Sequence, residues 1–249
     1  SETSLIEILE GLNESALRND NLFFTLFGKL VEINQAIKKI SPLNIRSKVI
    51  NCDDQILMTD KPTDAIKFKK NSSMQLSIDH VSSGKSQAVL SCGNTGALMA
   101  ISLLKLRTIA SIKRPSIASI WPNIKGESIV LDLGANIKND TTSLIDNAIL
   151  GSALAKVLFN MVEPSIGLLN VGIEEMKGNE NVQRASEILT EMSSKKQLNY
   201  YGFVEGADIS NGKTNVVVTD GFTGNIALKT AEGTAFMVQS YFKKAFKSS

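Results

Sequence analysis

The chain has few of the residues that build metal sites and disulfide frameworks. Its 249 residues include one histidine and two cysteines, Cys52 and Cys92, which lie far apart and form no C-x-x-C pair. A zinc site or a disulfide framework is therefore not expected, and the low cysteine use fits a reducing cytoplasm.

Excess charge, aromatic side chains and long apolar runs are also scarce. The formal net charge is +2 and aromatic residues make up 6% of the chain. Neither a basic field nor a base-stacking platform therefore indicates nucleic-acid binding. No run of eighteen uncharged apolar residues occurs, which argues against a membrane-spanning helix, and no signal-peptide pattern begins at Ser1. The 43% hydrophobic content suffices for a sizeable core.

Several common enzyme motifs are missing. The absence of G-x-G-x-x-G gives no support to a dinucleotide cofactor, and the absence of G-x-S-x-G gives none to a serine hydrolase. Gly84-Lys85-Ser86 resembles the end of a Walker A loop, but Asp79 stands where the first glycine is required. The lone His80 is interpreted as structural. We expect neither a cofactor nor a metal.

Strand-like and helix-like patterns alternate along the whole chain. This alternation predicts an α/β fold, a three-layer α/β/α sandwich around a mostly parallel sheet, with residues 1–249 forming one domain. Strands are expected over 22–27, 48–50, 88–91, 116–121, 128–133, 166–171, 200–204 and 215–219, with a turn over 122–126. Helices are expected over 5–17, 31–40, 74–84, 97–110, 142–162, about 180–192 and 223–246.

Glycine-rich loops follow several of these strands. A strand, a tight turn and a helix in that order present backbone N–H groups to an anion such as phosphate. The loops would open on the same sheet edge, so we predict a single phosphate-handling site there. For any one loop, a helix cap with a tight turn is an equally good interpretation. The loop residues concerned are Gly93, Asn94, Thr95, Gly96, Asp132, Gly134, Asn136, Lys177, Asp220, Gly221, Phe222, Thr223, Gly224 and Asn225.

Four sequence blocks together resemble the bacterial PlsX family, in family order and with similar spacing over nearly the whole chain. The blocks are Ser91-Cys92-Gly93-Asn94-Thr95-Gly96-Ala97-Leu98-Met99, Leu131-Asp132-Leu133-Gly134-Ala135-Asn136, Gly167-Leu168-Leu169-Asn170-Val171-Gly172 with Lys177-Gly178-Asn179, and Asp220-Gly221-Phe222-Thr223-Gly224-Asn225.

The resemblance implies transfer of a fatty acyl group from acyl carrier protein to inorganic phosphate, which yields acyl phosphate for phospholipid synthesis. It also implies a homodimeric, cytoplasmic, peripherally membrane-associated enzyme with a fold related to phosphotransacetylases and isopropylmalate-type dehydrogenases. The family's first strand with its Asp-Ala-Met-Gly-Gly-Asp-type loop and its C-terminal segment have no counterpart here, so we expect truncation at both ends. Ile173 stands where many members have Glu.

The chemistry of this reaction suits the residues present. Much of inorganic phosphate is dianionic at pH 7, and a thiolate is a good leaving group. The protein therefore has to position the two substrates and stabilise the oxyanion of the tetrahedral intermediate. Each positioned hydrogen-bond donor can supply about 3–4 kcal/mol of that stabilisation. We hypothesise that Lys177 and Asn225 are the catalytic pair, Lys177 neutralising anionic charge and Asn225 donating a hydrogen bond. Asp220 would orient Lys177 or a loop N–H, or would simply form the turn.

The remaining site residues are expected to shape the loops. Asp132, with Gly134 and Asn136, would form one of them, and the loop of Gly221, Phe222, Thr223 and Gly224 would bind substrate. The candidate phosphate cradle consists of Gly93, Asn94, Thr95 and Gly96.

Other interpretations remain open at this point. Cys92 offers an acyl-cysteine route, although a buried thiol at a strand end is ordinary packing. The chain could instead be a phosphotransacetylase that uses acyl-CoA, or a non-catalytic protein that binds acyl carrier protein. Two lysine clusters could dock an acidic carrier protein or simply be solvated: Lys67, Lys69 and Lys70, and Lys243, Lys244 and Lys247.

Overall fold

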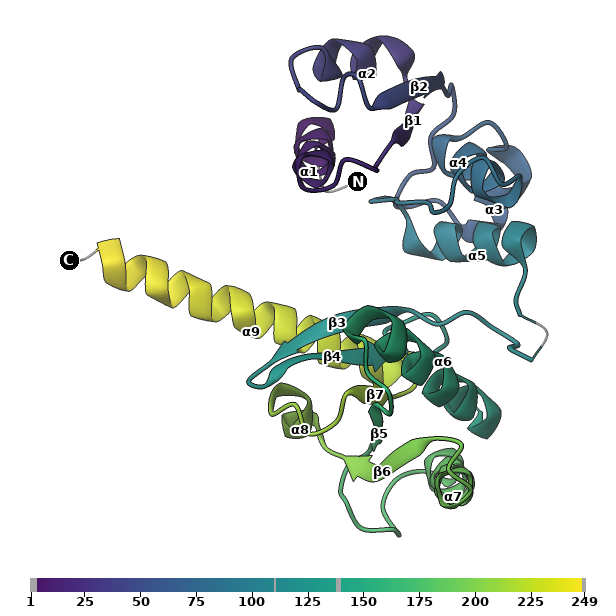
Figure 1. Cartoon of the computed structure of the whole chain (residues 1–249), viewed down its shortest axis with the longest axis vertical. Helices are drawn as coiled ribbons and strands as arrows, with labels where there is room; N and C mark the ends of the chain where they lie inside the picture. The colour runs from purple at the N-terminus through teal and green to yellow at the C-terminus, as the bar shows by residue number, and fades with distance from the viewer. Residues whose placement is uncertain (1–3, 110, 138–139, 248–249) are drawn as a thin grey trace. The chain divides into compact units, whose positions relative to one another are not determined.

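The computed structural model describes residues 4–109, 111–137 and 140–247 (Figure 1). Residue contacts divide the chain into two compact units, unit 1 (Ser1–Ile109) and unit 2 (Ala110–Ser249). The organisation as one domain stays a prediction, and each unit is described here by itself.

Unit 1 contains a parallel pair of strands, β1 (Phe24–Gly28) and β2 (Ser47–Asn51). One core lies beside this pair and includes the buried Leu9 and Ile33, while a second core joins three helices around Ile78 and Ile101. The helices of unit 1 are α1 (Leu5–Arg18), α2 (Leu30–Ile37), α3 (Pro62–Phe68), α4 (Ser73–Ser82) and α5 (Thr95–Leu106).

Unit 2 is built on a five-stranded sheet in the order β3-β4-β7-β5-β6. The β3–β4 pair is antiparallel, and the other neighbouring strands are parallel. This sheet confirms the predicted α/β fold with a mostly parallel sheet. The strands are β3 (Ala118–Asn123), β4 (Gly126–Leu131), β5 (Ser165–Leu169), β6 (Asn199–Val204) and β7 (Val216–Val218).

Helices cover both faces of the unit 2 sheet. Alternate residues of each strand face opposite ways, so Leu131 belongs to the core under α6 (Thr141–Phe159) and α7 (Glu180–Ser194). Val130 and Val217 belong to the core on the other face, which also contains Ile209 of α8 (Gly206–Ser210) and Leu228 of α9 (Gly221–Lys247). Figure 1 shows the resulting layers.

Helix α6 is long and apolar enough to cross a membrane by length and composition alone. It carries Asp146 and Lys156, so it does not contradict the expectation that no uncharged apolar run of eighteen residues occurs. Its Leu144, Ala148 and Ala155 are buried against the sheet in the main core of unit 2. It is therefore the core helix of an α/β unit.

Two expectations about the backbone and one about a side chain were wrong. Residues 88–91 form no strand, and Leu90 is 74% exposed, because this short apolar run does not pair with a neighbouring strand. Cys92 is consequently exposed rather than buried. Strand β3 continues through Pro122 to Asn123, so the predicted turn is shorter.

Helix boundaries also differ from the prediction. Helix α6 ends three residues early because Asn160 takes a left-handed conformation, with φ 53°. Helix α5 begins at Thr95, two residues early, and ends at Leu106. Helices α3 and α8 were not predicted, since each is only one or two turns long and has too few residues to show a period.

Candidate active site

Three loops of unit 2 leave the same edge of the sheet. Strand β7 lies between β4 and β5, and its Val218 pairs with both Leu131 and Leu168. Because the three strands are parallel, the loops that begin at residues 132, 170 and 219 all follow carboxyl ends at one edge. This is where ligands bind in open α/β sheets.

Asp132 organises the loop after β4. Its fully buried carboxylate accepts hydrogen bonds from the backbone N–H groups of Gly134 (3.1 Å), Ala135 (2.8 Å) and Asn136 (2.9 Å). It also accepts from the Asn136 side-chain amide at 2.9 Å and from the Ile117 N–H at 3.3 Å. Asp132 therefore shapes the loop after β4 through these hydrogen bonds, and a part for it in binding substrate stays a prediction.

The loop after β7 packs directly on the loop after β4. The Gly221 N–H donates to the Asn136 carbonyl at 2.9 Å, and a Cβ at Gly221 would lie 2.5 Å from that same oxygen. A Cβ at Gly224 would overlap the Asp132 carbonyl oxygen. Glycine is thus required at both positions because one backbone approaches another.

Asp220 caps helix α9. Its carboxylate accepts from the Thr223 N–H at 2.9 Å and from the Thr223 hydroxyl at 2.7 Å. Thr223 lies in the first turn of α9, so these contacts match the turn-forming interpretation of Asp220. Its role in catalysis stays a prediction.

Lys177 lies in the loop between β5 and α7, which side-chain amides tie down. Asn170 Nδ2 donates to the Lys177 carbonyl at 3.1 Å, and the Lys177 N–H donates to the Glu174 carbonyl at 3.0 Å. Gln183 Nε2 lies 2.8 Å from the Met176 carbonyl oxygen. The Lys177 side chain itself is exposed, and its ammonium has no ion-pair or hydrogen-bond partner among the described residues.

Asn225 projects from the second turn of α9 beside the loop after β4. A Cβ at Gly134 would lie 3.5 Å from the Asn225 Cβ and Cγ atoms. The Asn225 side chain is exposed, and within the described part of the chain its amide makes no hydrogen bond. Asn225 therefore lies against the loop after β4, and Lys177 lies in the loop that follows β5 at the same sheet edge.

The Gly93–Gly96 loop belongs to unit 1, where Asn94 has a structural role. The Asn94 side-chain oxygen accepts from the Ala97 N–H at 3.0 Å and caps α5. Its amide donates to the carbonyls of Leu57 (3.2 Å), Met58 (3.1 Å) and Asp60 (3.0 Å). The phosphate cradle of Gly93, Asn94, Thr95 and Gly96 stays a prediction.

Two loop-fixing residues were missed in the sequence. Asn170 stands in a recognised block but was given no role, and Gln183 lies outside every block. Both act through hydrogen bonds to backbone carbonyls five to seven residues away, which no residue pattern in the sequence reveals. In the chain as described, no group of three or more His, Cys, Asp or Glu side chains could hold a metal ion.

The lysine clusters are only partly available to a partner. Lys69 Nζ lies 2.5 Å from the Asp60 carboxylate and 2.8 Å from the Gln55 carbonyl oxygen. The Lys69 ammonium is therefore already paired within unit 1. Lys67 and Lys70 are exposed. In the second cluster, the Lys247 side chain lies outside the described residues.

Comparisons with known proteins identify the family of this chain. The family model described as "Fatty acid synthesis protein" matches residues 1–249. A phosphate acyltransferase from Azorhizobium caulinodans is 47% identical over 239 residues, which cover 96% of this chain and 67% of the relative. One from Chelativorans sp. is 47% identical over 238 residues, covering 95% and 68%.

Solved structures support the fold. A phosphotransacetylase from Streptococcus pyogenes aligns with a TM-score of 0.61 and 16% identity, over 94% of this chain and 88% of that one. The EutD phosphotransacetylase from Staphylococcus aureus covers the same shares at a TM-score of 0.56 and 16% identity. The chain belongs to the fatty acid synthesis protein family, the PlsX family indicated by its motifs, and is an acyltransferase.

Proposed function

We propose that this chain transfers a fatty acyl group from the thioester of acyl carrier protein to inorganic phosphate, and that the acyl phosphate formed enters phospholipid synthesis. One observation carries the proposal. At the carboxyl edge of the unit 2 sheet, Lys177 and Asn225 have no partners among the described residues, whereas Asp132, Asn136 and Asp220 hold the loops. A cation on a fixed loop and an amide donor near the start of a helix suit an anionic substrate.

The mechanism follows from these groups. A phosphate oxygen attacks the thioester carbonyl carbon, a C–O bond forms, and the tetrahedral intermediate breaks its C–S bond to release a thiolate that is protonated by solvent. The Lys177 ammonium holds the phosphate, and the Asn225 amide donates to the developing oxyanion; donors of this kind contribute about 3–4 kcal/mol each.

Acyl phosphate formation by the full chain tests this function. We expect Lys177→Met and Asn225→Ala each to lower turnover by orders of magnitude with little change in the thermal midpoint, because both side chains are exposed and unpartnered among the described residues. Lys156→Met, which alters another exposed lysine of unit 2, is the matched control. Wild-type turnover in either site variant would remove that residue from the mechanism.

The acyl donor is tested in the same assay. Thioesters of acyl carrier protein and of CoA, supplied at equal concentration, distinguish the proposed enzyme from a phosphotransacetylase-like one. We expect the carrier-protein thioester to be used with the higher kcat/KM. Preference for the CoA thioester would overturn this part of the proposal.

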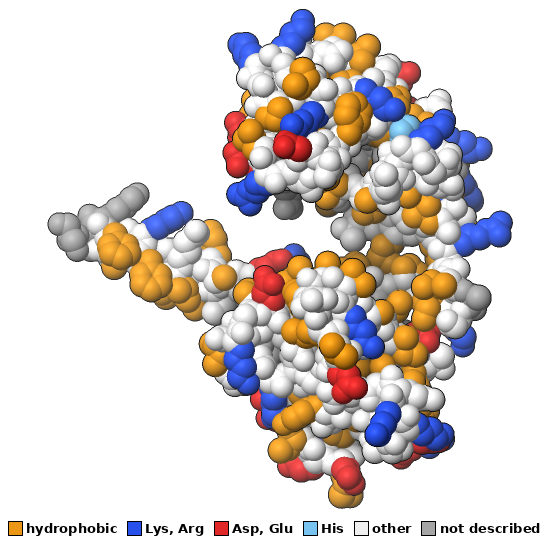
Figure 2. Space-filling view, in the orientation of Figure 1, with side chains coloured by type: hydrophobic (Ala, Val, Ile, Leu, Met, Phe, Trp, Pro, Cys, Tyr) orange, Lys and Arg blue, Asp and Glu red, His pale blue; other side chains and the backbone are white. Residues whose placement is uncertain are grey.

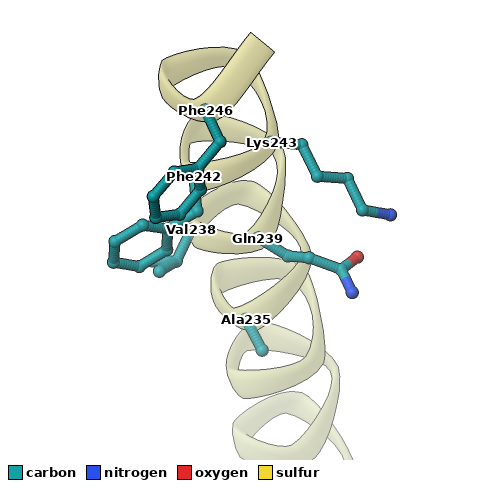
Figure 3. Close-up of a pocket in the computed structure, with 6 residues that line it drawn as sticks. All are labelled: Ala235, Val238, Gln239, Phe242, Lys243 and Phe246. Carbon is teal, nitrogen blue, oxygen red and sulfur yellow. The ribbon is translucent and has the colours of Figure 1, made fainter. Parts of the chain in front are cut away.

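We also propose that the protein is a cytoplasmic homodimer with peripheral membrane contact. The support is the C-terminal half of α9, where Phe236, Phe242 and Phe246 are 70%, 60% and 79% exposed. Figure 2 shows apolar side chains along this helix. A hollow of about 710 Å³ on α9 is lined by Ala235, Val238, Gln239, Phe242, Lys243 and Phe246 (Figure 3). A second subunit would bury these side chains.

A further inference from the structure

The Gln183 side chain faces the backbone of the Lys177 loop. Its Nε2 atom lies 2.8 Å from the Met176 carbonyl oxygen, 3.2 Å from that of Gly178 and 3.4 Å from that of Lys177. An amide NH2 group has two hydrogens, so it can donate to two of these carbonyls at once and share one with the third. Three successive peptide groups are thereby held by one side chain.

Helix α7 holds Gln183 in place. Asn179 caps this helix by accepting from the Val182 N–H at 3.1 Å, and the Gln183 N–H bonds to the Asn179 carbonyl at 3.0 Å. Val182 and Ala185, on either side of Gln183, are buried in the main core of unit 2. The amide of Gln183 is therefore fixed relative to the sheet, and the loop is fixed relative to that amide.

Asn170 completes the arrangement from the opposite end of the loop. It directly follows β5, and its Nδ2 donates to the Lys177 carbonyl at 3.1 Å. The backbone at Lys177 is thus bonded from both the strand and the helix that flank the loop. The flexible side chain of Lys177 therefore extends from a fixed Cα atom. This lowers the conformational entropy that Lys177 loses when its ammonium binds an anion.

We propose that Gln183 is a positioning residue for Lys177, and that it sets the affinity of the site for the phosphate substrate without touching that substrate. This inference rests on the proposed function of Lys177. The Gln183 amide is half-buried and is directed at carbonyls of its own loop. Replacing the Gln183 amide leaves the sheet and the core contacts of α7 in place. The replacement therefore changes only the geometry of the Lys177 loop.

The test compares steady-state kinetics of Gln183→Met with the wild-type chain. Methionine has a similar length but no N–H donor. We expect KM for inorganic phosphate to rise, and kcat/KM for phosphate to fall about tenfold to a hundredfold. KM for the thioester should be unchanged and the thermal midpoint nearly so. Gln197→Met, at an exposed glutamine that follows α7, serves as the matched control and should behave as the wild type.

A double-mutant cycle separates positioning from a general structural role. If Gln183 acts through Lys177, Gln183→Met should have no further effect on phosphate affinity in a Lys177→Met background. Titration calorimetry with inorganic phosphate measures this affinity even where turnover is too low. Equal effects of Gln183→Met in both backgrounds, or equal rises of both KM values, would overturn the positioning role. Wild-type behaviour of Lys177→Met alone would instead overturn the proposed function.

Discussion

Polar side chains at the carboxyl edge of the unit 2 sheet are of two kinds, those with hydrogen-bond partners among the described residues and those without. Asp132 and Asp220 use their carboxylates to accept backbone N–H groups, which shapes the loops. Lys177 and Asn225 have no partner in the described part of the chain and are exposed. Residues of the first kind hold the loop geometry, and we propose that residues of the second kind bind the ligand.

Two glycines of α9 provide a matched pair for testing the close approach of the loops. A Cβ at Gly224 would overlap the Asp132 carbonyl oxygen, whereas a Cβ at Gly233 would meet nothing within 4 Å. We expect Gly224→Ala to lower the thermal midpoint and the activity. Gly233→Ala should stabilise the helix by about 0.5–1 kcal/mol. Unfolding curves of both variants test this, and equal midpoints would contradict the close approach.

The buried Asp132 carboxylate gives a second prediction. In Asp132→Asn an amide replaces a carboxylate that accepts from four backbone N–H groups and one side-chain amide. Some of those donors lose their acceptor, so we expect a loss of about 1–3 kcal/mol of unfolding free energy. Urea unfolding measures it, with Asp146→Asn on α6 as control. An unchanged midpoint would show that the loop does not depend on this carboxylate.

At the scale of elements, helix α4 carries the single histidine. His80 Nδ1 lies 2.9 Å from the Ser86 hydroxyl, and its ring meets Phe27 edge-on at 5.4 Å. Burial, followed by the nearby charges of Lys48 and Lys85, lowers the pKa of His80 below its usual value. These contacts support the structural role predicted for it.

The lowered pKa of His80 makes the stability of unit 1 depend on pH. The unfolded chain, with an ordinary histidine pKa near 6.5, binds its proton before the folded chain does. Stability is therefore fully present above about pH 6.5 and falls as the pH drops through that value toward the folded-state pKa. We expect the thermal midpoint to decrease over this window and His80→Gln to flatten the decrease. An identical pH profile in the variant would contradict this role.

The long, periodic elements could be predicted from the sequence, and the short ones could not. Helix α6 and strand β5 show clear apolar patterns, and their ends differ from the prediction by only a few residues. The strand predicted over 88–91 is absent, because an apolar run forms a strand only beside a partner strand, and the local sequence does not show whether one is present. The candidate site was predicted from its glycine loops and stays a prediction, and Gln183 was not predicted because its partners are backbone carbonyls.

At the scale of the whole molecule, the apolar side of α9 bears on the proposed homodimer. We expect light scattering to give a dimer mass for the wild-type chain and a monomer mass for Phe242→Glu/Phe246→Glu, because two buried carboxylates would oppose association. Phe68→Glu, at a residue 76% exposed in unit 1, should remain a dimer. A monomeric wild-type chain, or an unaffected double variant, would contradict the proposed dimer.

A crystal structure of the chain soaked in inorganic phosphate tests the central claim most directly. The claim is that separate loops of unit 2 form one anion site with Lys177 and Asn225 as its free donors. We expect an ordered phosphate bound by Lys177 Nζ and Asn225 Nδ2 at the carboxyl edge of the sheet. An ammonium and an amide that face opposite surfaces, with the phosphate bound by neither, would contradict it.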